Sequence, residues 1–278
     1  MMNQNVFGLI GINAKDANWN ADENGYPRKS ATAACLKEAM RQYWNETGKR
    51  VLSIRGNRRE NKTFEGRYEE VFGEKVSEDK AFKNILTAVD CRQFGFSFDV
   101  NGYEISQRGV SQIGCGININ SDTKIKMGNI IMTDQANYCY PFSIWGRGFH
   151  NFKGLDSEIK DYSEEDYKDF IAAAAICADR LKSYKRRGCR NEYLLVVETD
   201  KDVVNHLDLY VLYNKGILNV QKLEDYLGQF RDRIKSAIIY INQELIQVEG
   251  CNLIEVKPLS LLQGTDMYSY NEVTTCVS

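Results

Sequence analysis

The stretch VFGLIGINA, residues Val6–Ala14, is a short apolar run that contains β-branched residues. A run of this length and composition is typical of a buried strand. The polar segment Lys15–Ser30 follows and indicates a structured loop, because it is rich in Asn, Gly and other turn formers. Thr32–Glu46 then has apolar side chains at helical spacing. The chain is therefore predicted to begin with a strand, a loop and a helix.

Further strands and an insertion are predicted beyond this helix. Val51–Ile54 is expected to form a brief strand, and the charge-rich residues 55–83 a partly helical insertion. Apolar residues alternate on both sides of Asn101-Gly102, which is a hairpin signal. We therefore expect strands over Gln93–Val100 and Tyr103–Ile119.

The clearest helix signal in the sequence lies in its second half. Glu164–Arg186 has an apolar stripe, Ser163 is placed to cap it, and Asp166 completes a capping box. The apolar run Tyr193–Glu198 follows as a strand. Beyond it we expect a strand over 207–213, a largely helical segment over 220–243 and a last strand over 253–256.

The order of these elements predicts the fold class. Strand, helix, strand, hairpin, helix, strand matches an α+β ferredoxin-like βαββαβ core that carries long insertions. RNA-recognition domains share this plan and offer a face of the sheet to single-stranded nucleic acid. Because no interdomain linker stands out, residues 1–278 are expected to form a single RRM-like domain.

Composition excludes several classes of protein. The 278 residues include 36 basic and 38 acidic residues, so the chain is not a polycation, although one face can still be basic. Eight cysteines without a CxxC pair and only two histidines do not give zinc spacings, so no metal or other cofactor is expected. No apolar run reaches the length of a membrane span, and the start lacks a signal-peptide pattern. We expect a cytoplasmic protein with reduced, mostly buried thiols.

Signatures of catalysis are also missing. The sequence has no GxxxxGK[ST], HExxH or GxSxG motif, and no GxGxxG that follows a strand and opens a helix. Asp16 and Asp22 could act as a base or hold a metal, but ordinary turn chemistry beside Gly25-Tyr26-Pro27 is the stronger explanation. His206 is expected to be structural, while His150 is left open between packing and ligand contact. We therefore do not expect an enzyme.

Basic clusters are the most informative functional feature of the residues themselves. Arg28 and Lys29 precede the first helix, and Lys37 and Arg41 continue along it. Such a row can follow a phosphate backbone, although a solvated helix face fits the same spacing. Met127 lies near two lysines and could wedge between bases at a hairpin tip. A further cluster, near the end of the second long helix, comprises Lys182, Lys185, Arg186, Arg187 and Arg190.

Five segments in order resemble motifs of the Cas7 family, the backbone subunits of type I CRISPR interference complexes (Cascade), close to the type I-B and I-C branch. They are Asn18-Trp19-Asn20-Ala21-Asp22 with Gly25-Tyr26-Pro27-Arg28, Asp90-Cys91-Arg92-Gln93-Phe94-Gly95, Gly109-Val110-Ser111-Gln112, Tyr140-Pro141-Phe142-Ser143 with Gly148-Phe149, and Tyr162-Ser163-Glu164-Glu165-Asp166. The second resembles the family's D-x-R-x-F-G strand, and the third its G-P-V-Q strand, with Val and Ser in place of the middle pair.

This resemblance implies a fold and an activity. Such proteins have an RRM-like palm with inserted fingers, here roughly 55–88, and a β-hairpin thumb, here roughly 120–140. Copies polymerise along the spacer of the crRNA beside other Cascade subunits. The guide bases then pair with target DNA, so that base pairing reads the sequence.

The same resemblance, together with the basic clusters, gives a set of expected RNA-binding residues. They are Arg28, Lys29, Lys37, Arg41, Arg92, Arg108, Gln112, Lys124, Lys126, Met127, Arg147 and His150, with Lys185, Arg186 and Arg187 as weaker candidates. Arg92 and Arg108 are placed on central strands, where a buried ion pair, for instance Asp90 with Arg92, is the alternative.

Two other functions compete with this prediction. Related backbone subunits of type III complexes cut target RNA with a loop aspartate, a role that would fall to Asp22 or Asp16. A protein-interaction scaffold without RNA would instead explain the basic clusters as solvated faces. RNA retention that falls steeply as salt rises distinguishes phosphate binding from the scaffold.

Overall fold

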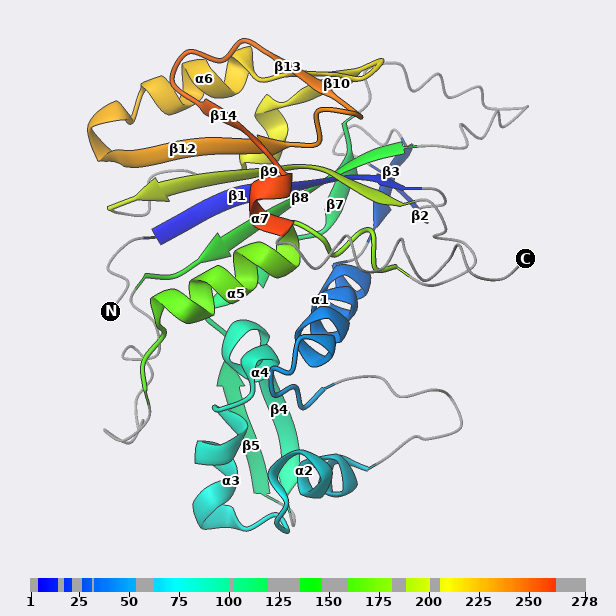
Figure 1. The fold of residues 1–278 in the computed structure, drawn as a ribbon, viewed down its shortest axis with the longest axis vertical. Coiled ribbons are helices and arrows are strands. Elements are labelled where there is room, and N and C mark those ends of the chain that lie inside the picture. The colour runs from blue at the N-terminus through cyan, green and yellow to red at the C-terminus, as the bar shows by residue number, and fades with distance from the viewer. Residues whose placement is uncertain are drawn as a thin grey trace.

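The fold is taken from a computed structural model, shown in Figure 1. The residues that it describes are 5–14, 18–21, 27–31, 33–53, 63–100, 103–119, 136–146, 160–181, 189–200 and 206–263. The helices are α1 (Ala34–Glu46), α2 (Phe64–Phe72), α3 (Glu78–Ile85), α4 (Val89–Phe94), α5 (Glu164–Ala174), α6 (Gln221–Gly228) and α7 (Ser260–Gln263), with 3₁₀ turns η3 (Leu207–Tyr210) and η4 (Arg231–Arg233).

The strands form three sheets in the described part of the chain. They are β1 (Asn5–Ala14), β2 (Asn18–Ala21), β3 (Pro27–Ala31), β4 (Gly95–Val100), β5 (Tyr103–Arg108), β6 (Ser111–Ile113), β7 (Gly116–Asn118), β8 (Ala136–Ile144), β9 (Arg190–Thr199), β10 (Leu212–Asn214), β11 (Ile217–Asn219), β12 (Ile234–Ile241), β13 (Gln247–Glu249) and β14 (Glu255–Pro258).

The central sheet has the order β14-β12-β9-β1-β8-β7-β3-β2, and β6 also pairs with β8. β1 lies antiparallel between β8 and β9, whereas β12 and β14 are parallel, so the sheet is mixed. The order β9-β1-β8-β6, with α1 and α5 as the connecting helices, is consistent with the predicted βαββαβ core. The fold is therefore α+β, as expected.

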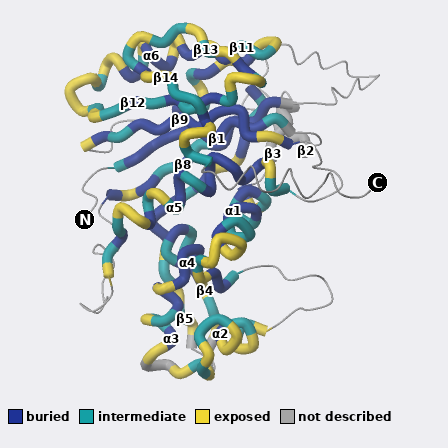
Figure 2. The backbone as a smooth tube through the Cα atoms, in the orientation of Figure 1, coloured by how far each residue is buried: buried dark blue, intermediate teal, exposed yellow. Residues whose placement is uncertain are grey.

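β1 is apolar from Val6 to Ile12 because both faces of the sheet are covered. Val6 and Ile10 belong to the core beneath α1 and α5, and Phe7 and Leu9 belong to a second core on the opposite face. A Cβ atom at Gly11 would collide with the ring of Tyr193, which explains the small residue there. Figure 2 shows the resulting buried centre of the molecule.

The second face of the sheet carries a layer built from residues 207–230 and 245–254, which flank β12 in the chain. It consists of η3, α6 and the small sheet β10-β11-β13, and its apolar side chains include Leu218, Leu223 and Leu227. The expectation that this face is open to nucleic acid is therefore wrong for β1, β9 and β12, whose side chains pack against the layer.

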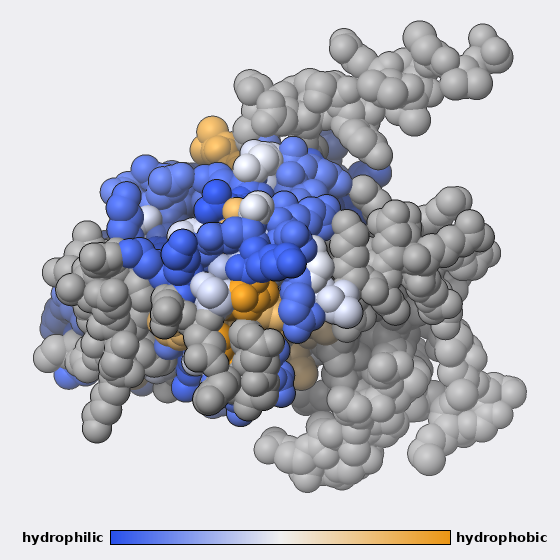
Figure 3. Space-filling view, turned by 90° about the horizontal axis from the view of Figure 1, so that it is seen from below, coloured by the Kyte–Doolittle hydropathy of each residue, from blue (hydrophilic) through white to orange (hydrophobic). Residues whose placement is uncertain are grey.

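A module of α2, α3, α4 and the β4–β5 hairpin extends from the sheet at the lower end of Figure 1. Its interior is aromatic: the rings of Phe64 and Phe98 stack with centroids 4.2 Å apart, and Phe96 lies 5.7 Å from Phe98. α2 and α3 confirm the predicted helical content of the described part of 55–83. Viewed from this end, the described surface is mostly hydrophilic around a small apolar patch (Figure 3).

Several predicted boundaries are wrong. α5 ends at Ala174 and not at Arg186, because the Asn191 side chain donates to the Ala174 carbonyl and accepts from the Ala178 amide. Residues 207–210 form a 3₁₀ turn, not a strand. The segment 220–243 is not largely helical: it contains the short helix α6 and the 3₁₀ turn η4, followed by β12.

Three further differences concern residues 15–30, 51–53 and 89–94. The predicted loop Lys15–Ser30 contains strands β2 and β3, which pair as a hairpin. Val51–Ser53, the described part of the predicted strand 51–54, is not a strand. Residues 89–94 form helix α4, so the predicted strand begins at Gly95 and not at Gln93.

Candidate nucleic-acid interface

Two cations of α1 lie against one aromatic ring. Lys37 Nζ lies 5.2 Å from the centroid of the Phe94 ring, and the guanidinium carbon of Arg41 lies 5.4 Å from the same centroid. A one-turn spacing along α1 brings both side chains to the same side of the helix. The structure thus joins Lys37 and Arg41, two of the predicted residues, through an aromatic residue that the sequence did not single out.

The Phe94 ring is itself held in place by packing. Its centroid lies 5.5 Å from that of Trp44, which is buried and donates a 3.0 Å hydrogen bond to the Asp169 carbonyl. The signal for Phe94 was present in the D-x-R-x-F-G motif, but the motif gives no hint that the ring meets α1. Packing against Trp44 thus fixes the ring that receives the two cations. We call Lys37, Arg41 and the Phe94 ring the α1 platform.

The two cations have different partners. Arg41 Nε lies 3.4 Å from Asp90 Oδ2 and its Nη1 lies 3.8 Å from Glu38. Lys37 is half-buried, and in the described part of the chain it has no carboxylate partner. Burial and then the neighbouring Arg41 lower the pKa of Lys37 below its ordinary value. A phosphate group beside Lys37 would raise this pKa again, because a nearby negative charge favours the charged ammonium group.

Asp90 is the buried counter-ion beneath this platform. Its side chain accepts hydrogen bonds from the backbone amides of Leu52 at 2.9 Å and Ser53 at 2.8 Å, in addition to the ion pair with Arg41. The predicted Asp90–Arg92 pair is wrong, because the basic partner of Asp90 is Arg41. Asp90 instead connects α1 to the chain that follows it.

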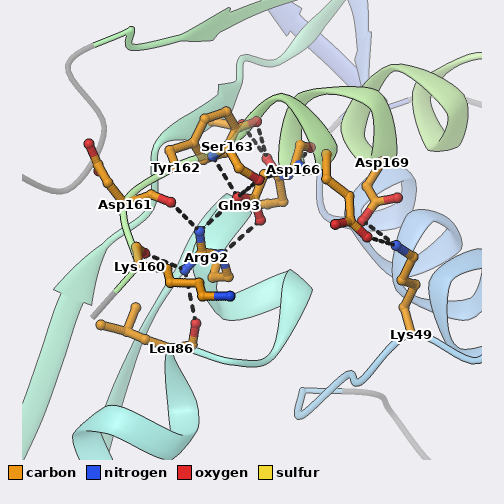
Figure 4. A network of polar contacts seen from close by, with 12 residues as sticks. Lys49, Leu86, Arg92, Gln93, Lys160, Asp161, Tyr162, Ser163, Asp166 and Asp169 are labelled. Atoms are coloured by element: carbon orange, nitrogen blue, oxygen red, sulfur yellow. Dashed lines mark hydrogen bonds and ion pairs between the residues drawn. The ribbon is translucent and has the colours of Figure 1, made fainter. Parts of the chain in front are cut away.

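Arg92 lies on α4 and not on a central strand, and its guanidinium group is fully occupied (Figure 4). Nε and Nη2 each lie 2.7 Å from one oxygen of Asp166. The other protons reach the carbonyls of Leu86, Lys160 and Asp161. Arg92 is thus a structural tie between α4 and the start of α5, as the buried-pair alternative proposed, with Asp166 as the partner.

Asp166 also serves α5 itself. The capping box that the sequence predicts for Ser163 and Asp166 is confirmed. Burial alone would raise the pKa of Asp166, but the Arg92 guanidinium and the Ser163 hydrogen bonds together hold that pKa below its ordinary value. Gln93 extends the network: its Nε2 donates to the Asp166 carbonyl at 2.6 Å and its Oε1 accepts from Tyr162 at 3.0 Å.

A cleft of about 470 Å³ lies beside this network. Lys49 and Arg50, which the sequence analysis did not single out, line it together with Lys160. Lys49 pairs with Glu165 at 2.8 Å and with Asp169 at 3.0 Å. Because its charges are of both signs and partly paired, the cleft is a weaker candidate for binding an anion than the α1 platform.

The other predicted residues are placed as follows. Arg28 and Lys29 lie on β3, Arg108 is exposed at the end of β5, and Gln112 is half-buried on β6. Lys124, Lys126, Met127, Arg147 and His150 lie outside the described residues, as do Asp16, Asp22, Lys182, Lys185, Arg186 and Arg187.

The described residues contain neither a cluster of metal ligands nor a membrane-spanning helix. Within the ranges given above, no three or more His, Cys, Asp or Glu side chains are grouped so that they could hold a metal ion. Over the same ranges, no helix has both the length and the apolar character needed to cross a membrane. Of the described cysteines, Cys115 is exposed and Cys91, Cys139, Cys177 and Cys189 are buried.

The fold and the site define an α+β protein with a mixed central sheet, an inserted helical module and a cationic platform on its first helix. A family model described as CRISPR-associated protein Cas7 matches residues 4–236. Because this match spans more than half of the sequence, the chain belongs to the Cas7 family.

The solved structures to which this chain is similar share little of its sequence. A chain of a structure titled "CRISPR RNA-guided surveillance complex, pre-nicking" has 9% identity and a TM-score of 0.46, with 96% of this chain and 99% of that chain covered. A chain titled "CRISPR RNA-guided surveillance complex" has 11% identity and a TM-score of 0.43, covering 95% and 99%. Csc2 of Thermofilum pendens has 9% identity and a TM-score of 0.32, covering 74% and 69%. No curated protein sequence matches this chain significantly.

Proposed function

We propose that this protein is a non-catalytic, RNA-binding backbone subunit of a type I CRISPR interference complex, of the I-B or I-C-like branch. Copies of it would polymerise along the crRNA spacer, beside other Cascade subunits, and present the guide bases for pairing with target DNA. Membership of the Cas7 family over residues 4–236 is the observation that carries this proposal.

The α1 platform supports backbone binding in particular. Lys37 is a half-buried cation without a carboxylate partner among the described residues, and it lies beside a second cation and a fixed aromatic ring. Phosphate contacts hold a nucleic-acid strand in place without reading its sequence. A subunit that binds guides of any sequence needs contacts of this type.

The remaining parts of the proposal follow the predicted division of the chain. The central sheet with α1 and α5 would be the palm, and the module of α2, α3, α4, β4 and β5 would contain the fingers. Residues 120–140 would supply the thumb; of these, 120–135 lie outside the described residues and 136–140 begin β8 of the central sheet. Lys37 and Arg41 are the first choice for phosphate contacts, followed by Arg28, Lys29, Arg108, Gln112, Lys124, Lys126, Met127, Arg147 and His150. Arg92 is left out because its donors are occupied.

Co-expression with a CRISPR repeat–spacer transcript tests the proposal. A discrete RNA of guide length in a high-mass particle is the expected result, and its retention should fall steeply with salt, by about 0.7 in log affinity per phosphate contact for each tenfold rise in salt. A monomer without RNA at low salt would overturn the proposal and favour the scaffold. Cleavage of matched RNA with magnesium, lost on Asp22→Ala, would favour the endonuclease.

A further inference from the structure

A buried carboxylate lies at a bulge in the central sheet. The pairing of β1 with β9 shifts register between Gly11, which faces Tyr193, and Ile12, which faces Asn191. Glu192 is therefore the extra residue on β9. A bulge breaks the alternation of side chains and often re-aims one of them. Here it directs Glu192 toward the C-terminal layer, where Tyr213 contacts it.

Three neutral side chains donate to this carboxylate. Asn137 Nδ2 lies 2.6 Å from Oε2, and Tyr213 Oη and Asn13 Nδ2 lie 3.3 Å and 3.5 Å from Oε1. Glu192 is only 2% exposed. Burial raises its pKa above the ordinary value although all three donors lower it. No described cation offsets the cost of burying this charge.

The donors come from three different elements. Asn13 is near the end of β1, Asn137 is at the start of β8, and Tyr213 is on β10. The backbone strengthens the same junction, because the Tyr213 amide donates to the Ile119 carbonyl at 3.1 Å. Glu192 thus ties the C-terminal layer to one end of the central sheet.

Glu224 provides a comparison within the same layer. It is also a buried carboxylate, but its partners are the backbone amides of Asn252, Leu253 and Ile254, all in one short segment. Glu224 therefore ties α6 to a segment of the same layer, whereas Glu192 ties that layer to the central sheet. A buried charge that costs stability and joins distant side chains points to a role in conformational specificity.

We propose that Glu192 is a positioning residue for RNA binding: it holds the C-terminal layer and the adjacent ends of β1 and β8 in the one arrangement that binds the guide strand. This inference rests on the proposed function. Glu192 itself would not touch RNA, because it is enclosed by the sheet and the layer. Its effect on RNA would pass through the end of β1, which leads along the chain into the β2–β3 hairpin with Arg28 and Lys29, and not through α1.

RNA affinity and hydrogen exchange of variants test this role. Glu192→Ala is expected to weaken RNA binding by about threefold to thirtyfold, the range for coupling through residues that do not touch the ligand. Glu192→Gln, which keeps one acceptor oxygen, should bind more tightly than Glu192→Ala. Glu224→Ala is the matched control: it also removes a buried carboxylate, and it should lower the melting temperature while leaving RNA affinity within about twofold of wild type, which is ~0.4 kcal/mol.

Two results would overturn the positioning role. One is wild-type RNA affinity in folded Glu192→Ala, and the other is an equal loss of affinity in Glu224→Ala. If Glu192→Ala does not fold, Tyr213→Phe removes a single donor and should weaken RNA binding in the same direction; wild-type affinity there counts against the proposal.

Hydrogen exchange separates this proposal from the proposed function. In Glu192→Ala, amides of β10 and β11 should exchange faster than in wild type while those of α1 and α5 do not change. If the wild-type protein retains no RNA, the proposed function fails but the exchange result still tests the tie. Unchanged exchange in β10 and β11 would show that Glu192 does not hold the layer.

Discussion

Lys37 Nζ lies 5.2 Å from the centroid of the Phe94 ring, on a platform that also receives Arg41. The attraction between a cation and a ring face offsets part of the cost of burying the ammonium group. It does not neutralise the charge, and Asp90 compensates Arg41 rather than Lys37. Among the described residues no carboxylate compensates Lys37, so we expect its positive charge to be available to an external anion.

Reversing this charge should disrupt RNA binding. Lys37→Glu is expected to lower RNA affinity by about tenfold or more, because an attractive contact with phosphate becomes repulsive. Lys37→Arg should retain most of the binding and Lys37→Ala should reduce the salt slope by about 0.7. Lys222→Glu, an exposed lysine on α6, is the matched control and should bind like wild type. Equal behaviour of the Lys37 and Lys222 reversals in a filter-binding titration would contradict the assignment.

Removing the buried counter-ion should cost stability. Asp90→Ala leaves the Leu52 and Ser53 amides without their acceptor and Arg41 without its buried partner. We expect a loss of about 3–5 kcal/mol in the free energy of unfolding, measured by urea titration. Asp225→Ala, an exposed residue on α6, should change it by less than ~0.5 kcal/mol. A loss below about 1 kcal/mol for Asp90→Ala would show that water replaces the carboxylate.

Local features of the fold could be predicted from the sequence, whereas contacts between distant segments could not. The Val6–Ala14 strand and the Ser163–Asp166 capping box depend on neighbouring residues, and both are confirmed. The early end of α5 depends on Asn191, a residue of the next strand. Periodicity could not reveal that contact.

In the candidate site, too, local spacing could be predicted from the sequence but contacts between distant segments could not. Spacing alone placed Lys37 and Arg41 on one side of a helix, but the ring beneath them comes from α4, more than fifty residues later in the chain. Arg92 was assigned to RNA because the sequence does not show its partner, Asp166, which is 74 residues away. Long-range pairing decides which basic residues are available.

The Arg92–Asp166 pair predicts one direction of pH dependence. The pKa of Asp166 is below its ordinary value of 3.8 in the folded protein, so the folded state favours the charged carboxylate. Its stabilising contribution is complete above pH 3.8 and is lost as the pH falls through the lower, folded pKa. The difference in free energy of unfolding between wild type and Asp166→Asn should therefore be constant near neutral pH and shrink in acid. A difference that grows on acidification would contradict the pairing.

The raised pKa of Glu192 predicts the opposite pH dependence of stability. Its pKa is above the ordinary value of 4.5 because burial outweighs the three neutral donors, so the folded state disfavours its charge. As the pH falls from neutral, the folded protein takes up this proton before the unfolded chain does, and stability is gained until pH 4.5, below which both states are protonated. Wild type should therefore gain stability relative to Glu192→Gln between neutral pH and pH 4.5, as followed by chemical unfolding. A constant difference over that range would mean that Glu192 titrates normally, and the cost of keeping its charge buried would then no longer support a positioning role.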